Sequence, residues 1–309
     1  MMAKLETGKA PRVRVSRKRS NESLAGWLFA LPWIIGLLLF FAYPLISSIY
    51  YSFTDYSILQ SGKFIGLANY RELFQDELFW ISIYNTIYFA VLFVPLSIIF
   101  GVALAMVLNM RVRGMAVYRT IFFLPTLVPH VALAILWIWL LNPQFGLVNA
   151  VLDWFGIQGP PWLGSTFWSK PALILMSLWG IGQAVIIYLA GLSDISQEYY
   201  EAAEVDGASF LQKTFYITLP LLTPVIFFNL VMGFIGAFQQ FTLPYTMTQG
   251  SGSPADSLTF YVMYLYDNAF SYFRMGYASA MAWILFVIIM ALTAIVFWSS
   301  KRWVHYQGD

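Results

Sequence analysis

The chain has 309 residues, of which 60% are hydrophobic and only 10% are charged, and its formal net charge is +2 at pH 7. A soluble domain carries about 25% charged residues, so this composition excludes an ordinary soluble protein and indicates an integral membrane protein. The sequence contains no cysteine, which excludes disulfides, thiolate nucleophiles and cysteine-ligated metals.

Residues 1–22 form a polar segment with seven lysines and arginines and without the apolar pattern of a packed core. We expect a basic, flexible cytoplasmic tail here, because membrane topology explains these cations more simply than a nucleic-acid partner does. The apolar run that follows is too long and bulky for a cleavable signal peptide, so it is predicted to be the first membrane span.

Six apolar stretches are each close to the roughly 20 residues that cross a bilayer. They lie at about 27–53, 81–108, 118–141, 171–192, 217–241 and 277–298. The sequence therefore predicts an all-α integral membrane protein, with one six-transmembrane-helix bundle over residues 23–309. An inside N-terminus puts 13 lysines and arginines on the cytoplasmic side and four outside, so both termini are predicted to be cytoplasmic.

The polar connection 193–216, between the fourth and fifth spans, is predicted to be cytoplasmic and helical. Asp194 or Ser196 can begin a helix by accepting hydrogen bonds from free backbone N–H groups, and acids follow where the helix dipole favours them. Two alanines favour helix, and Gly207 permits the turn into a second short helix. The connection should form a compact, acidic helix-turn-helix that a soluble partner can hold in a cleft.

The spacing of this connection resembles the EAA loop of permease subunits of ATP-binding-cassette importers. Glu201-Ala202-Ala203 is followed after three residues by Gly207, and after nine more by Ile217-x-Leu219-Pro220. The segments Phe64-x-Gly66-Leu67-x-Asn69-Tyr70, Asn85-Thr86, Tyr264-x-Tyr266 and Gly276-Tyr277-Ala278-Ser279-Ala280 are similar to the carbohydrate branch of these permeases. The turn Thr248–Pro254 departs from the Thr-x-Gly-Gly-Pro-like turn of many relatives.

This resemblance implies the membrane subunit of an ATP-driven, binding-protein-dependent importer that moves a sugar or oligosaccharide into the cytoplasm. It implies a location in the cell (cytoplasmic) membrane, surrounded by the lipid bilayer. The implied partners are a second homologous permease, two ATPase subunits that bind the ATP and an extracytoplasmic solute-binding protein. The residues implied in coupling to the ATPases are Glu198, Glu201, Ala202, Ala203, Asp206 and Gly207.

The residues of the chain itself indicate transport without catalysis. The sequence has no Gly-x-x-x-x-Gly-Lys-Ser/Thr phosphate-binding loop, so ATP hydrolysis is assigned to partners, and no cofactor is expected. His130 and His305 are far apart, so no metal site and no catalytic residue are predicted. An ion-coupled transporter or a polytopic membrane enzyme usually places ionisable groups inside its spans, and no clear acid or base is found there. An importer of glycerol-phosphate or another polar solute stays an alternative.

Polar and small residues in the spans flanking the EAA-like loop are the candidates for a substrate path. Amides both donate and accept hydrogen bonds, which suits a polyhydroxylated ligand, and small residues leave room for one. The candidates are Trp179, Gly180, Gln183, Asn229, Gly233, Ala237 and Gln240. The alternative interpretation is that these amides only join helix to helix and that the aromatic residues face lipid.

Overall fold

The computed structural model describes residues 18–110 and 112–305, and within them the fold is helical, with two isolated β-bridges. Four helical runs are long and apolar enough to cross a membrane: Gly26–Ser52, Glu77–Leu108, Phe210–Thr248 and Met275–Ser300. Two further spans are broken. Met115–Leu127 and His130–Leu140 meet at 99°, and Ser169–Trp179 and Gly182–Ser193 meet at 50°. Counting each bent pair as one span gives the six that hydropathy predicts.

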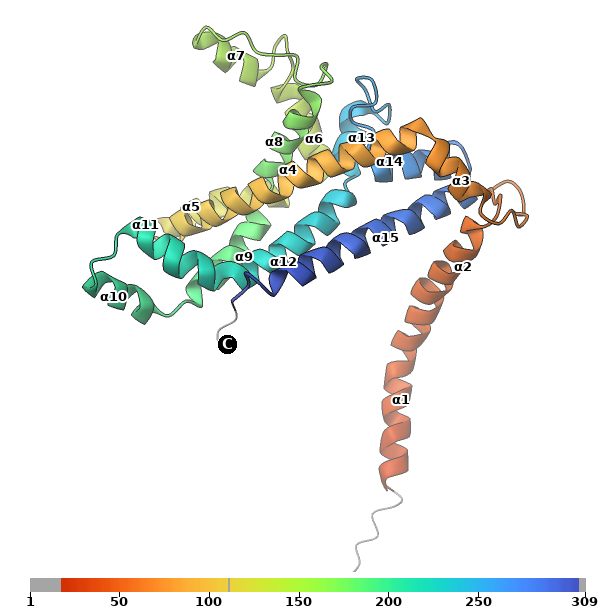
Figure 1. Cartoon of the computed structure of the whole chain (residues 1–309), viewed down its shortest axis with the longest axis horizontal. Helices are drawn as coiled ribbons and strands as arrows, with labels where there is room; N and C mark the ends of the chain where they lie inside the picture. Colours follow the sequence, from red (N-terminus) through yellow and green to blue (C-terminus); the bar gives the residue numbers. More distant parts are fainter. Residues whose placement is uncertain (1–17, 111, 306–309) are drawn as a thin grey trace, which may run out of the picture.

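The body of the protein is built around α4 (Glu77–Leu108), which packs against α12 (Leu219–Phe238) and α9 (Gly182–Ser193). Helix α15 (Met275–Ser300) lies beside α12 (Figure 1). Helices α6 (His130–Leu140) and α8 (Ser169–Trp179) rise from this body and lead to α7 (Leu147–Trp154). The first half of the third span comprises α5 (Met115–Phe123) and the 3₁₀ turn η2 (Leu124–Leu127).

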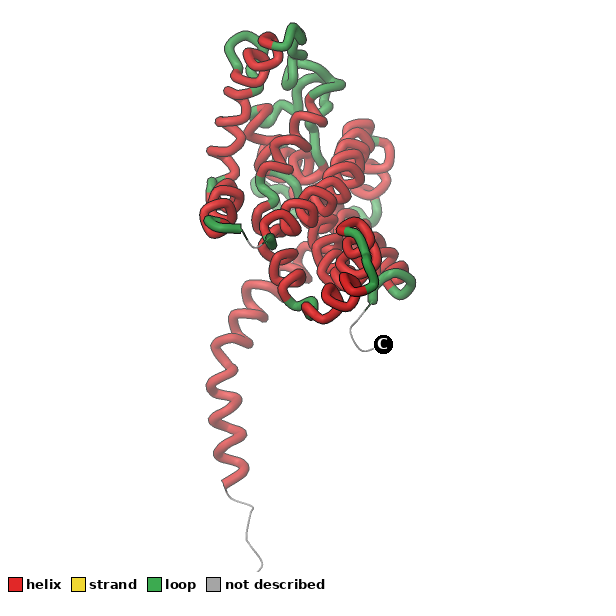
Figure 2. The backbone as a smooth tube through the Cα atoms, turned by 90° about the vertical axis from the view of Figure 1, so that its left-hand side faces the viewer, coloured by secondary structure: helices red, strands yellow, loops and turns green. Residues whose placement is uncertain are grey.

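The first span stands apart from the rest of the bundle. It comprises α1 (Lys18–Leu37), the π-helical turn η1 (Leu38–Ala42) and α2 (Tyr43–Ser52). Helix α2 packs against α15, whereas α1 projects away from the body as an isolated rod (Figures 1 and 2). Residues 18–22 of the predicted tail already belong to α1, and residues 1–17 lie outside the described part of the chain.

Two separate apolar cores hold the body together. The outer core surrounds the N-terminal half of α4 and includes Phe79, Phe89, Phe260 and Tyr277. The inner core lies where the C-terminal half of α4 meets α9 and α12, and it consists of Val102, Ala105, Leu108, Val185, Tyr188, Leu192, Ile195 and Leu222. Burial of these side chains fixes α9 and α12 against α4 near the segment that joins them.

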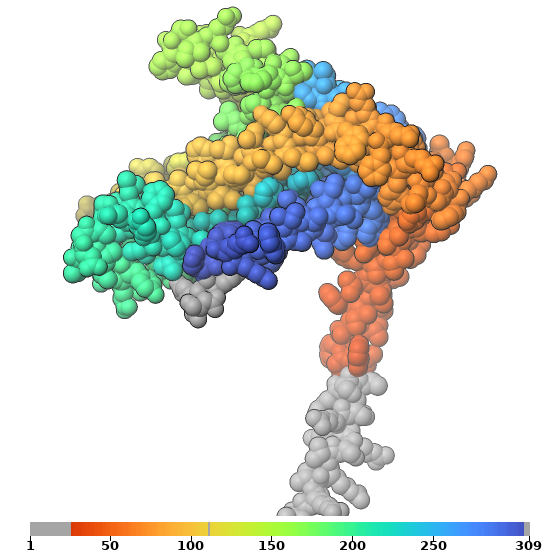
Figure 3. Space-filling model, viewed as in Figure 1, coloured from red at the N-terminus to blue at the C-terminus, as the bar shows by residue number. Residues whose placement is uncertain are grey.

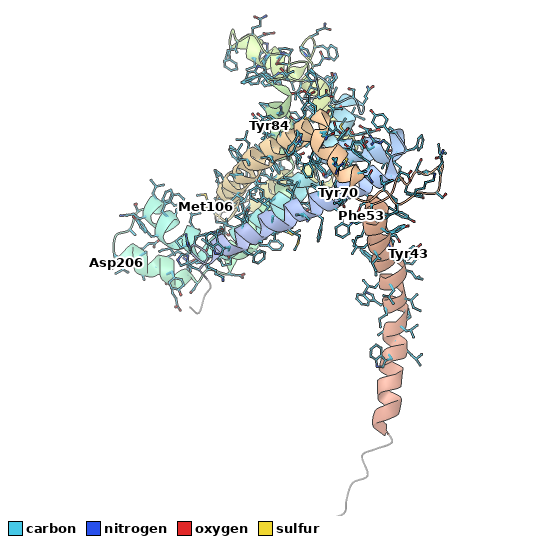
Figure 4. The ribbon with its side chains drawn as sticks, turned by 45° about the vertical axis from the view of Figure 1, so that its right-hand side comes forward. Tyr43, Phe53, Tyr70, Tyr84, Met106 and Asp206 are labelled. Atoms are coloured by element: carbon cyan, nitrogen blue, oxygen red, sulfur yellow. The ribbon has the colours of Figure 1, made fainter. Side chains whose placement is uncertain are left out.

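Two outer segments, one between the first and second spans and one between the fifth and sixth, are held against the bundle by the motifs that are similar to carbohydrate permeases. These segments carry α3 (Ala68–Gln75), α13 (Thr242–Thr248), α14 (Tyr261–Tyr266) and the π-helical turn η4 (Asp267–Ser271). The Asn69 amide donates to the Ser52 and Thr54 carbonyls, at 2.8 and 2.9 Å. The Asn85 amide donates to the Asp256 and Thr259 carbonyls, at 2.8 and 3.0 Å. Phe53 packs beside Tyr70 at the corner between α2 and α3 (Figure 4).

Candidate functional site: a knob and a cavity joined by two helices

The connection between the fourth and fifth spans forms a protruding knob, residues 196–213, at the C-terminal end of α4 (Figures 1 and 3). It contains α10 (Gln197–Val205) and α11 (Phe210–Lys213), which leads into the π-helical turn η3 (Thr214–Thr218). Ser196 caps α10 by accepting from the Glu198 N–H, at 3.3 Å. Ser209 and Gln212 form a reciprocal capping box on α11. The predicted helix-turn-helix is therefore present and begins at Ser196.

The turn between the two knob helices depends on Gly207. Its φ is +76°, a left-handed backbone angle that glycine adopts without steric cost. The Gly207 N–H donates to the Glu204 carbonyl at 3.0 Å, and the next N–H, of Ala208, donates to Ala203 at 2.9 Å. These bonds satisfy carbonyls that the end of α10 would otherwise leave unpaired.

The predicted coupling residues lie together on this knob. Glu198, Glu201, Ala202, Asp206 and Gly207 are exposed, and Ala203 is half-buried. Figure 4 shows Asp206 at the end of the knob, away from Met106 on α4. The structure thus gathers the six residues on a solvent-facing element, and their role in coupling stays a prediction.

A cavity of about 240 Å³ lies where the two broken spans meet. The cavity is lined by Pro125, Thr126, Val128, His130 and Leu133, which lie at the break of the third span and in the helix after it. Met176, Ser177, Gly180 and Gln183 of the fourth span also line the cavity, together with Phe93 of α4, Gln240 between α12 and α13, and Leu243 of α13. A Cβ atom on Gly182 would lie 2.7 Å from the Phe122 carbonyl oxygen, so only glycine lets the two breaks approach this closely.

The cavity contains three of the seven predicted substrate-path residues: Gly180, Gln183 and Gln240. The other four lie elsewhere. Trp179 packs edge-on against Trp137, and the Asn229 amide donates to the Val225 carbonyl of its own helix. Gly233 faces Val94 on α4, and Ala237 is only 2% exposed. The positions of Gly233 and Ala237 agree with helix packing, whereas the Asn229 amide bonds within its own helix and does not join two helices.

His130, Thr126 and Ser177 line the cavity but were not among the predicted substrate-path residues. The signal that locates His130 and Thr126 is proline, since Pro125 and Pro129 bracket the break in the third span. Discontinuous helices expose backbone and place polar side chains at the middle of a span, where transport sites are built. The hydroxyls of Thr126 and Ser177 donate to carbonyls of their own segments, those of Phe123 and Leu173, at 2.7 and 2.8 Å.

Helices α9 and α12 each connect the cavity to the knob. Helix α9 begins beside the cavity at Gly182 and Gln183 and ends at Ser193, just before the knob. Helix α12 begins just after η3 and ends beside Gln240 on the cavity wall. At 1.5 Å per residue they are about 18 and 30 Å long. Because both pack against α4 and against each other, a displacement at the knob end has a rigid route to the cavity.

Apolar spans, two of them broken around a cavity whose mostly apolar wall carries five polar side chains, together with a solvent-facing acidic knob, define a polytopic membrane transport protein. The family model described as "Binding-protein-dependent transport system inner membrane component" matches residues 94–305. The chain belongs to this family and is a permease subunit of an ATP-binding-cassette importer, as the EAA-like loop predicted.

The chain is similar to three curated permeases over nearly its whole length. A probable ABC transporter permease protein of Bacillus subtilis, YesP, is 44% identical over 97% of both chains. The sulfoquinovosyl glycerol transport permease SmoG of Agrobacterium fabrum is 34% identical over 89% of this chain and 90% of its own length. The lactose transport permease LacF of Rhizobium radiobacter is 33% identical over 94% of this chain and 98% of its own length.

A solved structure has the same fold. It is a chain of a bacterial alginate ABC transporter in complex with an alginate pentasaccharide-bound periplasmic protein. The match has a TM-score of 0.77 at 27% identity and covers 92% of this chain and 96% of the other. The all-α six-span permease architecture predicted from hydropathy and from the motifs is therefore confirmed.

Proposed function

We propose that this permease moves a sugar or oligosaccharide across the cytoplasmic membrane through the cavity between its broken spans. The amides of Gln183 and Gln240 both donate and accept, as alternating sugar hydroxyls require, and the Phe93 ring adds an apolar face. The named solutes of the similar proteins, a sulfoquinovosyl glycerol, lactose and alginate, support this class. A phosphorylated polyol is the second candidate, because the His130 imidazole on the wall can bind a phosphate.

We infer that energy comes from two partner ATPase subunits, one of which holds the knob of this chain in a cleft. The sequence lacks a phosphate-binding loop, so the chain acts as a transport subunit without its own ATPase site. Glu198, Glu201 and Asp206 face solvent on a firmly capped helix, next to the small side chains of Ala202 and Ala203. Such a surface suits a cleft on a soluble partner, whose closure would displace α10.

A second, homologous permease and an extracytoplasmic binding protein complete the proposed assembly. Helix α1 projects from its own bundle with bulky apolar side chains exposed, including Trp27, Phe29 and Trp33, and a neighbouring membrane subunit would bury them. Delivery of solute by a binding protein is supported by the family description and by the periplasmic protein in the alginate complex.

The proposed orientation has both termini and the knob in the cytoplasm. The asymmetry of 13 inner against four outer lysines and arginines supports it. The C-terminal end of the described chain agrees, because the His305 N–H donates to Thr223 Oγ1 at 2.9 Å, close to the start of α12 and the knob.

The observation that carries this proposal is the pair of helices α9 and α12, which run between the cavity and the knob. The test is affinity purification of the tagged chain from its native membrane, followed by mass spectrometry and uptake assays in proteoliposomes. Recovery of an ATPase with a phosphate-binding loop and of a second six-span chain, with ATP-dependent sugar uptake, is expected. Recovery of the folded chain alone, with uptake that stops when ion gradients collapse, would overturn it. Competition by sn-glycerol 3-phosphate but not by sugars would favour the second candidate.

A further inference from the structure

Helix α10 is nearly detached from the bundle. None of its residues is buried, and most of its side chains face solvent. Within the described part of the chain, Tyr200 is the one α10 side chain that packs against the inner core. Any force applied to α10 therefore reaches the bundle through its two covalent ends and through the face that carries Tyr200.

That face is joined to the segment before α12 by two side-chain links one helical turn apart. The hydroxyl oxygens of Tyr200 and Thr218 lie 3.0 Å apart, and Thr218 Oγ1 lies 3.3 Å from the Lys213 carbonyl oxygen. Since a carbonyl can only accept, Thr218 donates to it and Tyr200 donates to Thr218. Glu204, four residues after Tyr200 on the same face, accepts from Lys213 Nζ at 2.7 Å.

The two links differ in strength. Glu204 and Lys213 are exposed enough for water and salt to screen their attraction, and such pairs contribute little. Thr218 is only 5% exposed and sits at the end of η3, directly before Leu219. A hydrogen bond fixes the direction as well as the distance between its two groups. Breaking the bond to Thr218 would also cost free energy, because it leaves a buried hydroxyl with one partner fewer.

We infer that the Tyr200–Thr218 hydrogen bond is the link through which a displacement of α10 is passed to α12, which makes Tyr200 and Thr218 positioning residues for transport. This inference rests on the proposed function, because it requires that a partner ATPase moves the knob. The knob itself forms without the link, since the Ser196 cap, the Ser209–Gln212 capping box and the Gly207 turn are separate from it.

The test compares Tyr200→Phe with the unchanged chain, in the whole complex isolated from native membranes and placed in proteoliposomes. Solute uptake and ATP hydrolysis are measured together. Phenylalanine keeps the ring against the inner core and removes only the hydroxyl. The number of ATP molecules hydrolysed per solute moved should rise about two- to twelvefold, the factor that one hydrogen bond corresponds to. Subunit recovery should stay unchanged, and the fall in the Tm of the complex should be too small to account for the lost coupling.

Matched variants separate this role from a merely structural one. Tyr199→Phe removes a hydroxyl from the exposed neighbouring residue and should change nothing. Thr218→Val should reproduce the Tyr200→Phe effect, and Thr218→Ser, which keeps the hydroxyl, should restore normal coupling. The double variant Tyr200→Phe with Thr218→Val should lose no more coupling than either single variant, because both remove the same bond.

Two results would overturn the inference. One is a normal ratio of ATP to solute in both Tyr200→Phe and Thr218→Val. The other is a fall in assembly or Tm that accounts for all lost uptake. Gly207→Pro, which should disrupt the whole knob, tells the two proposals apart: if it uncouples ATP use from uptake while Tyr200→Phe does not, only the present inference fails. If Gly207→Pro transports normally, the coupling role of the knob fails as well.

Discussion

Gly101 on α4 lies so close to the ring of Tyr188 on α9 that a Cβ atom at position 101 would come within 2.8 Å of Tyr188 Cε2. Tyr188 is fully buried in the inner core, and its hydroxyl has no hydrogen-bond partner among the described residues. The close approach of α4 and α9 thus depends on the absence of one side chain. Because α9 leads from the cavity to the knob, this contact bears directly on the proposed transport route.

Gly101→Ala should therefore destabilise the permease by about 1–3 kcal/mol, the usual effect of overpacking a filled core. The matched control is Gly236→Ala on α12, where an added Cβ would meet nothing within 4 Å. It should be neutral or stabilising, since alanine favours helix over glycine. Thermal unfolding of the purified complex in detergent measures both. Equal Tm values for the two variants would contradict the importance of this contact.

At the other end of α4, Asp76 organises the outer segments. Its carboxylate accepts from the hydroxyls of Tyr264 and Tyr277 and also caps α4 through the Leu78 N–H. Asp76→Asn keeps the cap but puts an N–H₂ group where two hydroxyls donate, so a loss of about 1–3 kcal/mol in unfolding free energy is expected. Glu77→Gln, at the next position, is the control and should cost less than half as much. Measuring the free energy of unfolding of both variants by chemical denaturation tests this prediction.

Tyr264 should make the same cluster sensitive to alkali. Burial, and then its hydrogen bond to Asp76, raise the pKa of Tyr264 to about 12, above its value of about 10 in an unfolded chain. The unfolded chain then loses this proton first as pH rises, so the stabilisation is complete below pH 10 and declines toward pH 12. Tm measured from pH 8 to 11.5 should fall less steeply in Tyr264→Phe than in the unchanged chain. Tm curves that fall equally steeply with pH in the two chains would contradict this prediction.

Hydropathy predicts the six spans because each must cover the same thickness of hydrocarbon with apolar side chains. It does not predict the 99° turn in the third span, because hydropathy reports only how apolar a stretch is, whereas the turn depends on Pro125, Pro129 and the partners of α6. The knob, in contrast, is encoded locally by Ser196, Gly207 and Ser209, so its helices and its turn could be predicted from the sequence.

The cavity wall could be predicted only in part. Gln183 and Gln240 stand out as amides in apolar spans, and both line it. Gly233 and Ala237 are small enough to leave room for a ligand, yet Gly233 packs against Val94 on α4 and Ala237 is buried, because a small residue serves close helix approach as well as it serves a ligand. The sequence does not single out His130, because a histidine far from other ligating side chains carries no metal signal. Its place on the wall follows from the bend beside it.

Gly207 provides a test of the knob that uses backbone geometry alone. Proline cannot adopt its φ of +76° and lacks the N–H that bonds Glu204, so Gly207→Pro should uncouple ATP use from uptake without preventing membrane insertion. Asparagine tolerates left-handed angles, so Gly207→Asn should keep most of the uptake. Uptake and ATPase activity in proteoliposomes measure both. Similar uptake by the two variants would mean that the turn is not needed for coupling.

The cavity residues should control how fast solute passes without affecting its capture outside. Gln183→Leu and Gln240→Leu keep side-chain size but remove the donor and acceptor, and each lost bond to a sugar hydroxyl corresponds to about 0.5–1.5 kcal/mol, or about two- to twelvefold in rate. The maximum uptake rate should fall by that factor, while the affinity of the partner binding protein for its solute stays the same.

Asn229→Leu is the matched control for these two variants, because within the described part of the chain the Asn229 amide bonds only the Val225 carbonyl of its own helix, and Asn229 does not line the cavity. It should leave the uptake rate within about twofold, since Asn229 lies outside the cavity wall and the variant removes no contact with the solute. Radiolabelled uptake at saturating binding protein distinguishes the three variants. If Asn229→Leu slows uptake as strongly as Gln183→Leu and Gln240→Leu, the solute does not pass by the cavity amides in particular, and the path must include the face of α12 that carries Asn229.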